Sequence, residues 1–221
     1  MAAKLYTYWR SSAAYRVRIA LNLKGMDYEP IPVSLKPGDD EHRKDEYRAI
    51  NPQMLVPFFD DGKVAIGQSM AILEYLEETY PGTPLLPDSE PSRSKVRAFC
   101  NAIACDIHPL NNLRVLNYLS DELGAADKQK SDWYAHWIAE GFRACEELSV
   151  RYAHHGPYAF GKDVTLADAL LAPHRSYTGE IRRLLADPGA HVKGFAHVTG
   201  GGVAGKQVGA DQIEIQPVDQ L

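Results

Sequence analysis

The first 26 residues lack acidic side chains altogether, although they carry five basic ones: Lys4, Arg10, Arg16, Arg18 and Lys24. The remaining residues hold 19 basic and 29 acidic side chains, so the 221-residue chain has a net charge of −5 and a pI near 5.9. A nucleic-acid-binding protein needs a surplus of Lys and Arg on one face, and this composition argues against that class. The basic first segment leaves room for a small anionic ligand near the N-terminus.

Long apolar runs and cysteines are also scarce. The longest apolar run is residues 54–59, whereas a membrane-spanning helix needs about 20, so no membrane partner is expected. The three cysteines, Cys100, Cys105 and Cys145, are expected to be buried thiols in a reducing compartment, and no Cys or His spacing indicates a metal site. An acid-free N-terminus also occurs in organelle transit peptides, but residues 4–8 alternate like a strand, so we expect a cytoplasmic protein.

Residues 1–80 show the pattern of a small α/β domain. Strands are expected at about 4–8 and 28–35, with a helix between them that starts at Ser11 or Ser12 and ends near residue 24. A helix at about 40–48, a hairpin over 56–66 and a helix opened by Gln68 and Ser69 follow. In that last helix, Glu77 is expected to face water.

The rest of the chain has a different character. Residues 81–91 contain four prolines and are expected to form a linker, and residues 92–173 should form an all-helical domain. Its helices are expected over 93–119, over 131–152 and after a capping box at Thr165 and Asp168. Pro109 lies inside the first of these and should kink it. The glycine-rich residues 174–221 are interpreted as an atypical tail, either chimeric or poorly ordered.

The expected helix start at Ser11 and Ser12 could bind a thiolate. A helix N-terminus and a neighbouring arginine, here Arg10, both lower the pKa of a thiol. Because no cysteine lies at this point in the sequence, the thiol would have to come from a ligand. An ordinary N-cap role for the serines remains open.

Two further features indicate a ligand. A proline opening a strand, as at Val56–Pro57, is compatible with a cis bond and would turn the Val56 backbone outward. Gln68 and Ser69 offer a second helix start, where a hydroxyl and free N–H groups suit a carboxylate. Together these features fit an extended peptide that carries a thiol.

Five motifs in order resemble the zeta class of glutathione transferases, and more narrowly its maleylacetoacetate and maleylpyruvate isomerases. They are residues 8–12 (YWRSS), 16–21 (RVRIAL), 51–57 (NPQMLVP), 68–72 (QSMAI) and 106–112 (DIHPLNN). The resemblance covers about residues 4–173. It implies a thioredoxin-like N-terminal domain, an all-α C-terminal domain, a homodimer, and glutathione as the cofactor.

The resemblance also implies site residues and an activity. Ser11 or Ser12 would bind the glutathione sulfur, the Val56 backbone would pair with the cysteinyl part, and Gln68 with Ser69 would bind the γ-glutamyl end. The family often has a cysteine where this chain has Ala13. The implied reaction is the conversion of maleylacetoacetate to fumarylacetoacetate in tyrosine and phenylalanine breakdown.

Arginine suits a dicarboxylate substrate because it binds carboxylates through two parallel hydrogen bonds. We expect Arg10 and Arg114 to form this clamp. His108 and Asn112 are expected to line the same site and to contact glutathione. A packing role for His108 remains equally open, and Arg16 is expected to be a surface charge.

The alternatives are maleylpyruvate isomerisation, general glutathione transfer including dehalogenation of small halo acids, and a glutathione-binding module with weak or no catalysis. The last follows from the tail, because residues 192–202 resemble a fragment of aminoimidazole ribonucleotide synthetase rather than a zeta-class ending. A fusion, rearrangement or sequence error would explain that change.

Overall fold

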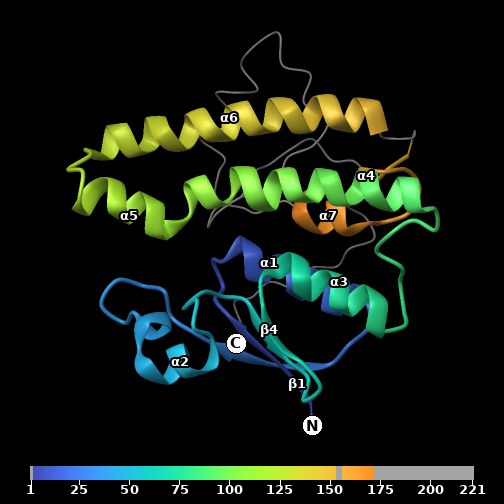
Figure 1. Ribbon diagram of the computed structural model, residues 1–221, viewed down its shortest axis with the longest axis horizontal. Coiled ribbons are helices and arrows are strands. Elements are labelled where there is room, and N and C mark those ends of the chain that lie inside the picture. The colour runs from blue at the N-terminus through green and yellow to red at the C-terminus, as the bar shows by residue number, and fades with distance from the viewer. Residues whose placement is uncertain (1, 153–155, 172–221) are drawn as a thin grey trace.

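The computed structural model describes residues 2–152 and 156–171, so the predicted atypical tail lies outside the described residues. Within these ranges the chain forms a sheet-containing part and a helical part (Figure 1). No helix in this portion is long and apolar enough to cross a bilayer.

The N-terminal part is built on a four-stranded sheet in the order β2-β1-β3-β4. The strands are β1 (Ala3–Thr7), β2 (Tyr28–Pro32), β3 (Phe58–Asp60) and β4 (Ala65–Gly67). Strand β1 runs parallel to β2 and antiparallel to β3, with Leu5 opposite Phe59 in the register. The β3–β4 pair is antiparallel, as the predicted hairpin requires.

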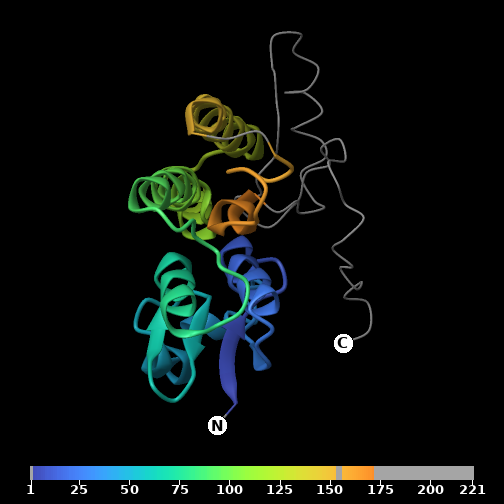
Figure 2. The ribbon, with the colours of Figure 1, turned by 90° about the vertical axis from the view of Figure 1, so that its right-hand side faces the viewer.

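Helices cover both faces of this sheet. Helices α1 (Ser12–Leu23) and α3 (Ser69–Thr79) lie between the sheet and the helical part (Figures 1 and 2). Helix α2 (Asp45–Ile50), which follows a 3-10 turn at Glu41–Arg43, places Tyr47 against Val33 and Val56 in a separate core cluster. This arrangement confirms the predicted thioredoxin-like α/β fold.

The helical part contains α4 (Glu90–Asn101), α5 (Leu113–Asp121), α6 (Asp127–Tyr152) and α7 (Leu166–Leu171). The expectation of one helix over 93–119 is wrong. A π-helical segment (Ala102–Ile107) and a 3-10 turn (Pro109–Asn111) separate α4 from α5. The His108 N–H donates to the Ile103 carbonyl, five residues back, and Pro109 has no N–H to continue the α-helical pattern. The predicted irregularity at Pro109 is therefore present.

One apolar core joins the two parts. It runs from Phe59 and Val17 through α3 to Phe99 in α4 and Leu166 in α7. The Leu166 N–H donates to the Leu85 carbonyl at 2.7 Å, which ties α7 to the segment between α3 and α4. The predicted capping box is present: Asp168 accepts hydrogen bonds from the Thr165 N–H and hydroxyl at 2.7 and 3.0 Å.

Glu77 binds the segment that connects the sheet-containing part to the helical part. Its carboxylate forms an ion pair with Lys24 at 2.7 Å and accepts from the Leu85 and Leu86 N–H groups at 2.9 and 3.2 Å. The Glu77 side chain is only 8% exposed, so the expectation that it faces water is wrong. The segment it binds folds back over α3 and needs an acceptor for its N–H groups.

Candidate functional site

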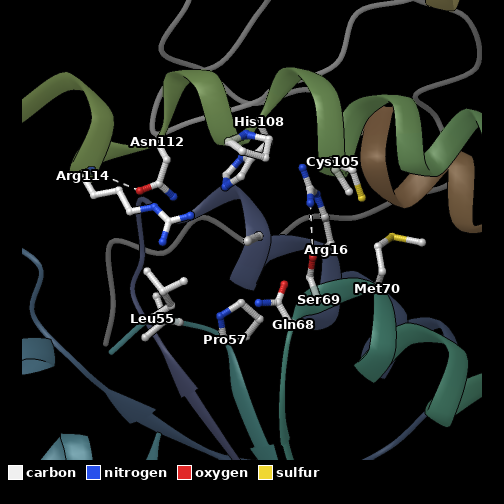
Figure 3. Close-up of a pocket in the computed structure, with 14 residues that line it drawn as sticks. Arg16, Leu55, Pro57, Gln68, Ser69, Met70, Cys105, His108, Asn112 and Arg114 are labelled. Atoms are coloured by element: carbon white, nitrogen blue, oxygen red, sulfur yellow. Dashed lines mark hydrogen bonds between the residues drawn. The ribbon is translucent and has the colours of Figure 1, made fainter. Parts of the chain in front are cut away.

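A pocket of about 160 Å³ lies where the sheet-containing part meets the helical part (Figure 3). Helix α1, the loop before β3 and the start of α3 line it from below, and the π-helical segment and α5 close it from above. Six of the predicted site residues line this pocket: Val56, Gln68, Ser69, His108, Asn112 and Arg114. Residues more than 50 positions apart in the sequence therefore share one cavity.

The two serines lie beside this pocket. Ser11 is the N-cap of α1, and its hydroxyl oxygen accepts from the Ala14 N–H at 3.2 Å. Ser12 is buried, and its Oγ lies 3.3 Å from Nδ1 of His108, in hydrogen-bonding contact with the helical part. Neither serine belongs to the pocket lining, but the next residue, Ala13, does. The helix start that was predicted to bind a thiolate thus adjoins the cavity.

Arg10 lies further out. Its side chain is exposed, and its guanidinium stacks over the Trp9 ring at 5.6 Å from the centroid. It does not belong to the pocket lining, unlike Arg114, its predicted partner in the clamp. The two arginines therefore do not share the cavity in this structure.

The loop before β3 is held by its own side chains. The Leu55 carbonyl accepts hydrogen bonds from the Tyr47 hydroxyl and the Asn51 amide, both at 2.7 Å. Burial raises the pKa of Tyr47 to about 12, so the hydroxyl keeps its proton at neutral pH. The peptide bond between Val56 and Pro57 is cis, as the sequence allowed. These contacts present the Val56 backbone at the pocket.

The start of α3 forms another wall. Gln68 has φ 67° and ψ 109°, a backbone conformation that side-chain-bearing residues rarely adopt. Its amide donates to Gln53 Oε1 at 2.8 Å. Ser69 then begins an 11-residue helix whose first N–H groups have no partners within the helix. This geometry directs a partial positive charge and several donors at the pocket.

Arg16 is a functional candidate that the sequence interpretation missed. It is only 2% exposed, so the expectation of a surface charge is wrong. Its Nη1 donates to Ser69 Oγ at 3.2 Å, and it lines the pocket. Burial lowers its pKa to about 10, which still leaves the guanidinium charged at neutral pH. The available signal was spacing: Arg16 precedes Ala20 by four residues and so lies on the apolar face of α1.

The upper wall contributes two polar residues and a thiol. Asn112 is the N-cap of α5, and its Oδ1 accepts from the Arg114 N–H at 3.1 Å. The Arg114 side chain points toward the pocket (Figure 3), and no ion pair engages it in residues 2–152 and 156–171. Cys105 also lines the pocket and is exposed, contrary to the expectation that all three cysteines are buried.

The arrangement has the parts needed to bind an extended, thiol-containing anionic peptide. The start of α1 offers a field that favours a thiolate. The Val56 backbone offers an edge for hydrogen bonding. The start of α3 offers N–H and hydroxyl donors for a carboxylate, and the buried Arg16 lies behind them. Across the cavity, Arg114 can bind a second, acidic molecule.

Comparisons with known proteins agree with this geometry. A family profile for the glutathione S-transferase N-terminal domain matches residues 5–84. The chain is similar to a probable maleylacetoacetate isomerase of Vibrio cholerae, with 47% identity over 173 residues that cover 78% of this chain and 80% of the relative. It is 48% identical over 170 residues to a maleylpyruvate isomerase of Ralstonia, covering 77% and 79%.

A solved structure is similar as well. The maleylacetoacetate isomerase of Methylobacterium extorquens AM1, crystallised with malonate and glutathione, superimposes with a TM-score of 0.71 at 40% identity. The match covers 75% of this chain and 77% of that one.

Proposed function

This chain belongs to the zeta class of glutathione transferases, as relatives of that class are 44% identical to it. On that premise we propose that it isomerises maleylacetoacetate to fumarylacetoacetate with glutathione. The observation that supports the proposal is the shared pocket. Val56 and the start of α3 at Ser69 line it from the sheet-containing part, and Arg114 lines it from the helical part. Val56, Gln68, Ser69 and Arg114 line one cavity, and the helix start proposed to bind the thiol adjoins it.

The residues of this chain fit glutathione. The buried Arg16 has no acidic partner in the described part of the chain and lies next to Ser69, which suits the γ-glutamyl carboxylate. The Val56 backbone, held by the contacts at Leu55, suits the cysteinyl group. The Ser11 helix start lies beside the same cavity and suits the sulfur.

When bound, glutathione supplies a thiol for reversible addition to the conjugated cis double bond of the substrate. The chain must lower the pKa of that thiol and stabilise negative charge on the substrate. Ser11 accepts from the Ala14 N–H, which leaves its O–H as a donor for the sulfur. The positive end of α1 acts in the same direction. The contact between Ser12 and His108 orients the second serine from the helical part.

Arg10 and Arg114 are proposed to bind the two carboxylates of the substrate. Arg114 lines the pocket, and Asn112 fixes the start of the helix that carries it. Arg10 is exposed, stacks on Trp9 outside the pocket lining, and would have to turn inward when substrate binds. Arg10→Ala and Arg114→Ala should each lower turnover more than glutathione affinity, and an unchanged rate removes that arginine from the clamp.

A second candidate substrate is maleylpyruvate, because the Ralstonia maleylpyruvate isomerase is 48% identical. The direct test follows the glutathione-dependent loss of the cis-substrate absorbance for both maleyl compounds at equal concentrations. A larger kcat/KM for maleylacetoacetate supports the first proposal, and a larger value for maleylpyruvate supports the second. Retention on immobilised glutathione without turnover of either compound would indicate a binding module instead.

We also propose a cytoplasmic homodimer, as the family resemblance implies. Light scattering after gel filtration would give twice the chain mass of 24.5 kDa if the dimer forms. A mass equal to that of one chain contradicts the dimer. Fractionation of the source cells tests the compartment.

A further inference from the structure

Cys105 is the thiol of this chain that opens onto the pocket. It belongs to the π-helical segment Ala102–Ile107 and is exposed, whereas Cys100 and Cys145 are buried and do not line the cavity. Its Sγ makes only a weak contact, with the Asn101 Oδ1 at 4.0 Å. A reagent that enters the pocket therefore meets the sulfur of Cys105.

A buried positive charge lies in the same cavity. Arg16 is 2% exposed and lines the pocket, and its Nε and Nη2 atoms have no hydrogen-bond partner in the described part of the chain. Burial lowers the pKa of Arg16 to about 10, and attraction to the thiolates of Cys100 and Cys105 acts in the opposite direction. Figure 3 shows the Arg16 side chain reaching toward the π-helical segment that carries Cys105. A positive charge near a thiol favours the reactive thiolate form.

The pairing of this thiol with this charge indicates an anionic disulfide as the reactant. Thiolates react with disulfides by exchange, and a buried unpaired charge attracts an anion. Oxidised glutathione has carboxylates, a disulfide, and the same peptide groups that the pocket is proposed to bind. We propose that Cys105 is a modification site, at which oxidised glutathione forms a mixed disulfide that closes the pocket to substrate. This inference rests on the proposed function and gives it a redox control.

The exchange consumes no further reactant. The Cys105 thiolate attacks one sulfur of oxidised glutathione, and a new S–S bond forms while the original S–S bond breaks. The second glutathione leaves as a thiolate and takes up the proton that Cys105 released. Cys105 is thereby oxidised and the departing glutathione reduced, and an excess of another thiol reverses the step. Cys100 and Cys145 should not take part, because burial raises the pKa of both.

The mixed disulfide would occupy the space that the reaction needs. Cys105 lines the same cavity as Val56 and Ser69, to which reduced glutathione is proposed to bind, and as Arg114, proposed to bind substrate. A tripeptide joined to Cys105 therefore excludes free glutathione, substrate, or both. Turnover should fall with the modified fraction and return when the disulfide is reduced.

The test treats the full-length protein with an excess of oxidised glutathione, which is then removed by gel filtration. Intact mass, a peptide map and initial turnover are measured on the same sample. The proteins are the unchanged chain, Cys105→Ser, and Cys145→Ala as the matched control. Because the assay supplies reduced glutathione, the rate is recorded at once, and its recovery should follow the loss of the added mass.

The unchanged chain and Cys145→Ala should each gain one glutathionyl group at Cys105, and their initial turnover should fall at least about 10-fold. Dithiothreitol should remove the group and restore the rate. Cys105→Ser should gain no group, and the treatment should leave its own rate within about twofold. Cys105→Ala replaces it if the serine variant does not fold.

The role of the charge has a separate test with two small disulfides. Dithiodipropionate carries two carboxylates, and cystamine carries two ammonium groups. The ratio of their rates at Cys105 should be at least about 10-fold higher in the native protein than in urea. Arg16→Gln should remove most of this difference. Arg18→Gln should keep it, because Arg18 lies on the same helix, donates to the Trp9 carbonyl and does not line the pocket. Equal ratios in the native and unfolded protein would overturn the role of Arg16.

The remaining outcomes also decide the matter. A modified Cys105 with undiminished initial turnover would overturn the inference in favour of an ordinary surface thiol. Binding of reduced glutathione without any added mass would overturn the inference and leave the proposed function standing. If the unchanged protein neither binds reduced glutathione nor turns over a maleyl compound, the proposed function fails and the inference fails with it.

Discussion

The buried ion pair between Lys24 and Glu77 offers a quantitative test of how the two parts of the chain are joined. The Nζ–Oε2 distance is 2.7 Å, and the two side chains are 3% and 8% exposed. Glu77 also accepts from the N–H groups of Leu85 and Leu86, which lead into the helical part. Replacing Lys24 by Met leaves a buried carboxylate that has only these two amide donors.

Removal of one partner from a buried ion pair costs about 3–5 kcal/mol. The two amide donors still bind the carboxylate, so Lys24→Met should lie at the lower end and lower the free energy of unfolding by about 3 kcal/mol. In the double variant Lys24→Met with Glu77→Gln, the buried charge is gone and an amide oxygen can still accept. That variant should recover at least about 1 kcal/mol.

Urea unfolding followed by circular dichroism and tryptophan fluorescence measures this effect. With a denaturant slope of about 2 kcal/mol/M, Lys24→Met should lower the midpoint by about 1.5 M. Lys128→Met is the control, because its ion pair with Asp132 is at the surface, with side chains 84% and 62% exposed. It should change stability by about 0.5 kcal/mol or less. A Lys24→Met loss below about 1 kcal/mol would refute the reasoning, since it would mean that the pair is well hydrated.

Three further outcomes are expected. Ser11→Asp should keep the helix cap and the free energy of unfolding, because Asp caps helices as well as Ser does. Its charge should raise the pKa of the bound glutathione thiol, measured by thiolate absorbance against pH, and a lowered pKa contradicts the thiol role of Ser11. Because the pKa of Tyr47 is raised from 10.0 to about 12, its contribution to stability is complete below pH 10 and is lost as the pH rises toward 12. Unfolding midpoints across that range should therefore fall more for the unchanged protein than for Tyr47→Phe, and equal falls refute this. Cys105 should react first with a thiol reagent, because it is exposed while burial raises the pKa of both Cys100 and Cys145. Glutathione should protect Cys105, because Cys105 lines the pocket. Simultaneous labelling of all three cysteines in the native protein contradicts this expectation.

Local chemistry made several features predictable. Ser11 is the N-cap of the first helix, because a hydroxyl there satisfies a free N–H whatever the rest of the chain does. At the start of α7 the Asp168 carboxylate accepts from the Thr165 N–H, so this contact is likewise local to neighbouring residues. Pro109 interrupts the helix because it lacks an N–H. The motifs between residues 8 and 112 also indicated the family, and six of the predicted site residues line the pocket.

Burial and distant contacts were decided by the tertiary structure. Arg16 and Arg18 are both basic residues on one helix, and only packing against Ser69 and the π-helical segment makes Arg16 part of the pocket. Glu77 was predicted to face solvent. It is buried because the chain after α3 folds back and places the N–H groups of Leu85 and Leu86 beside its carboxylate.

The sequence by itself determined the acid-free, basic first segment and the helix start within it, because these follow from residue types and their neighbours. The tertiary structure decided which of those charges became buried. Burial depends on what arrives from elsewhere in the chain, and a hydrogen bond such as Ser12 to His108, across 96 positions, exists only once the two parts have packed together.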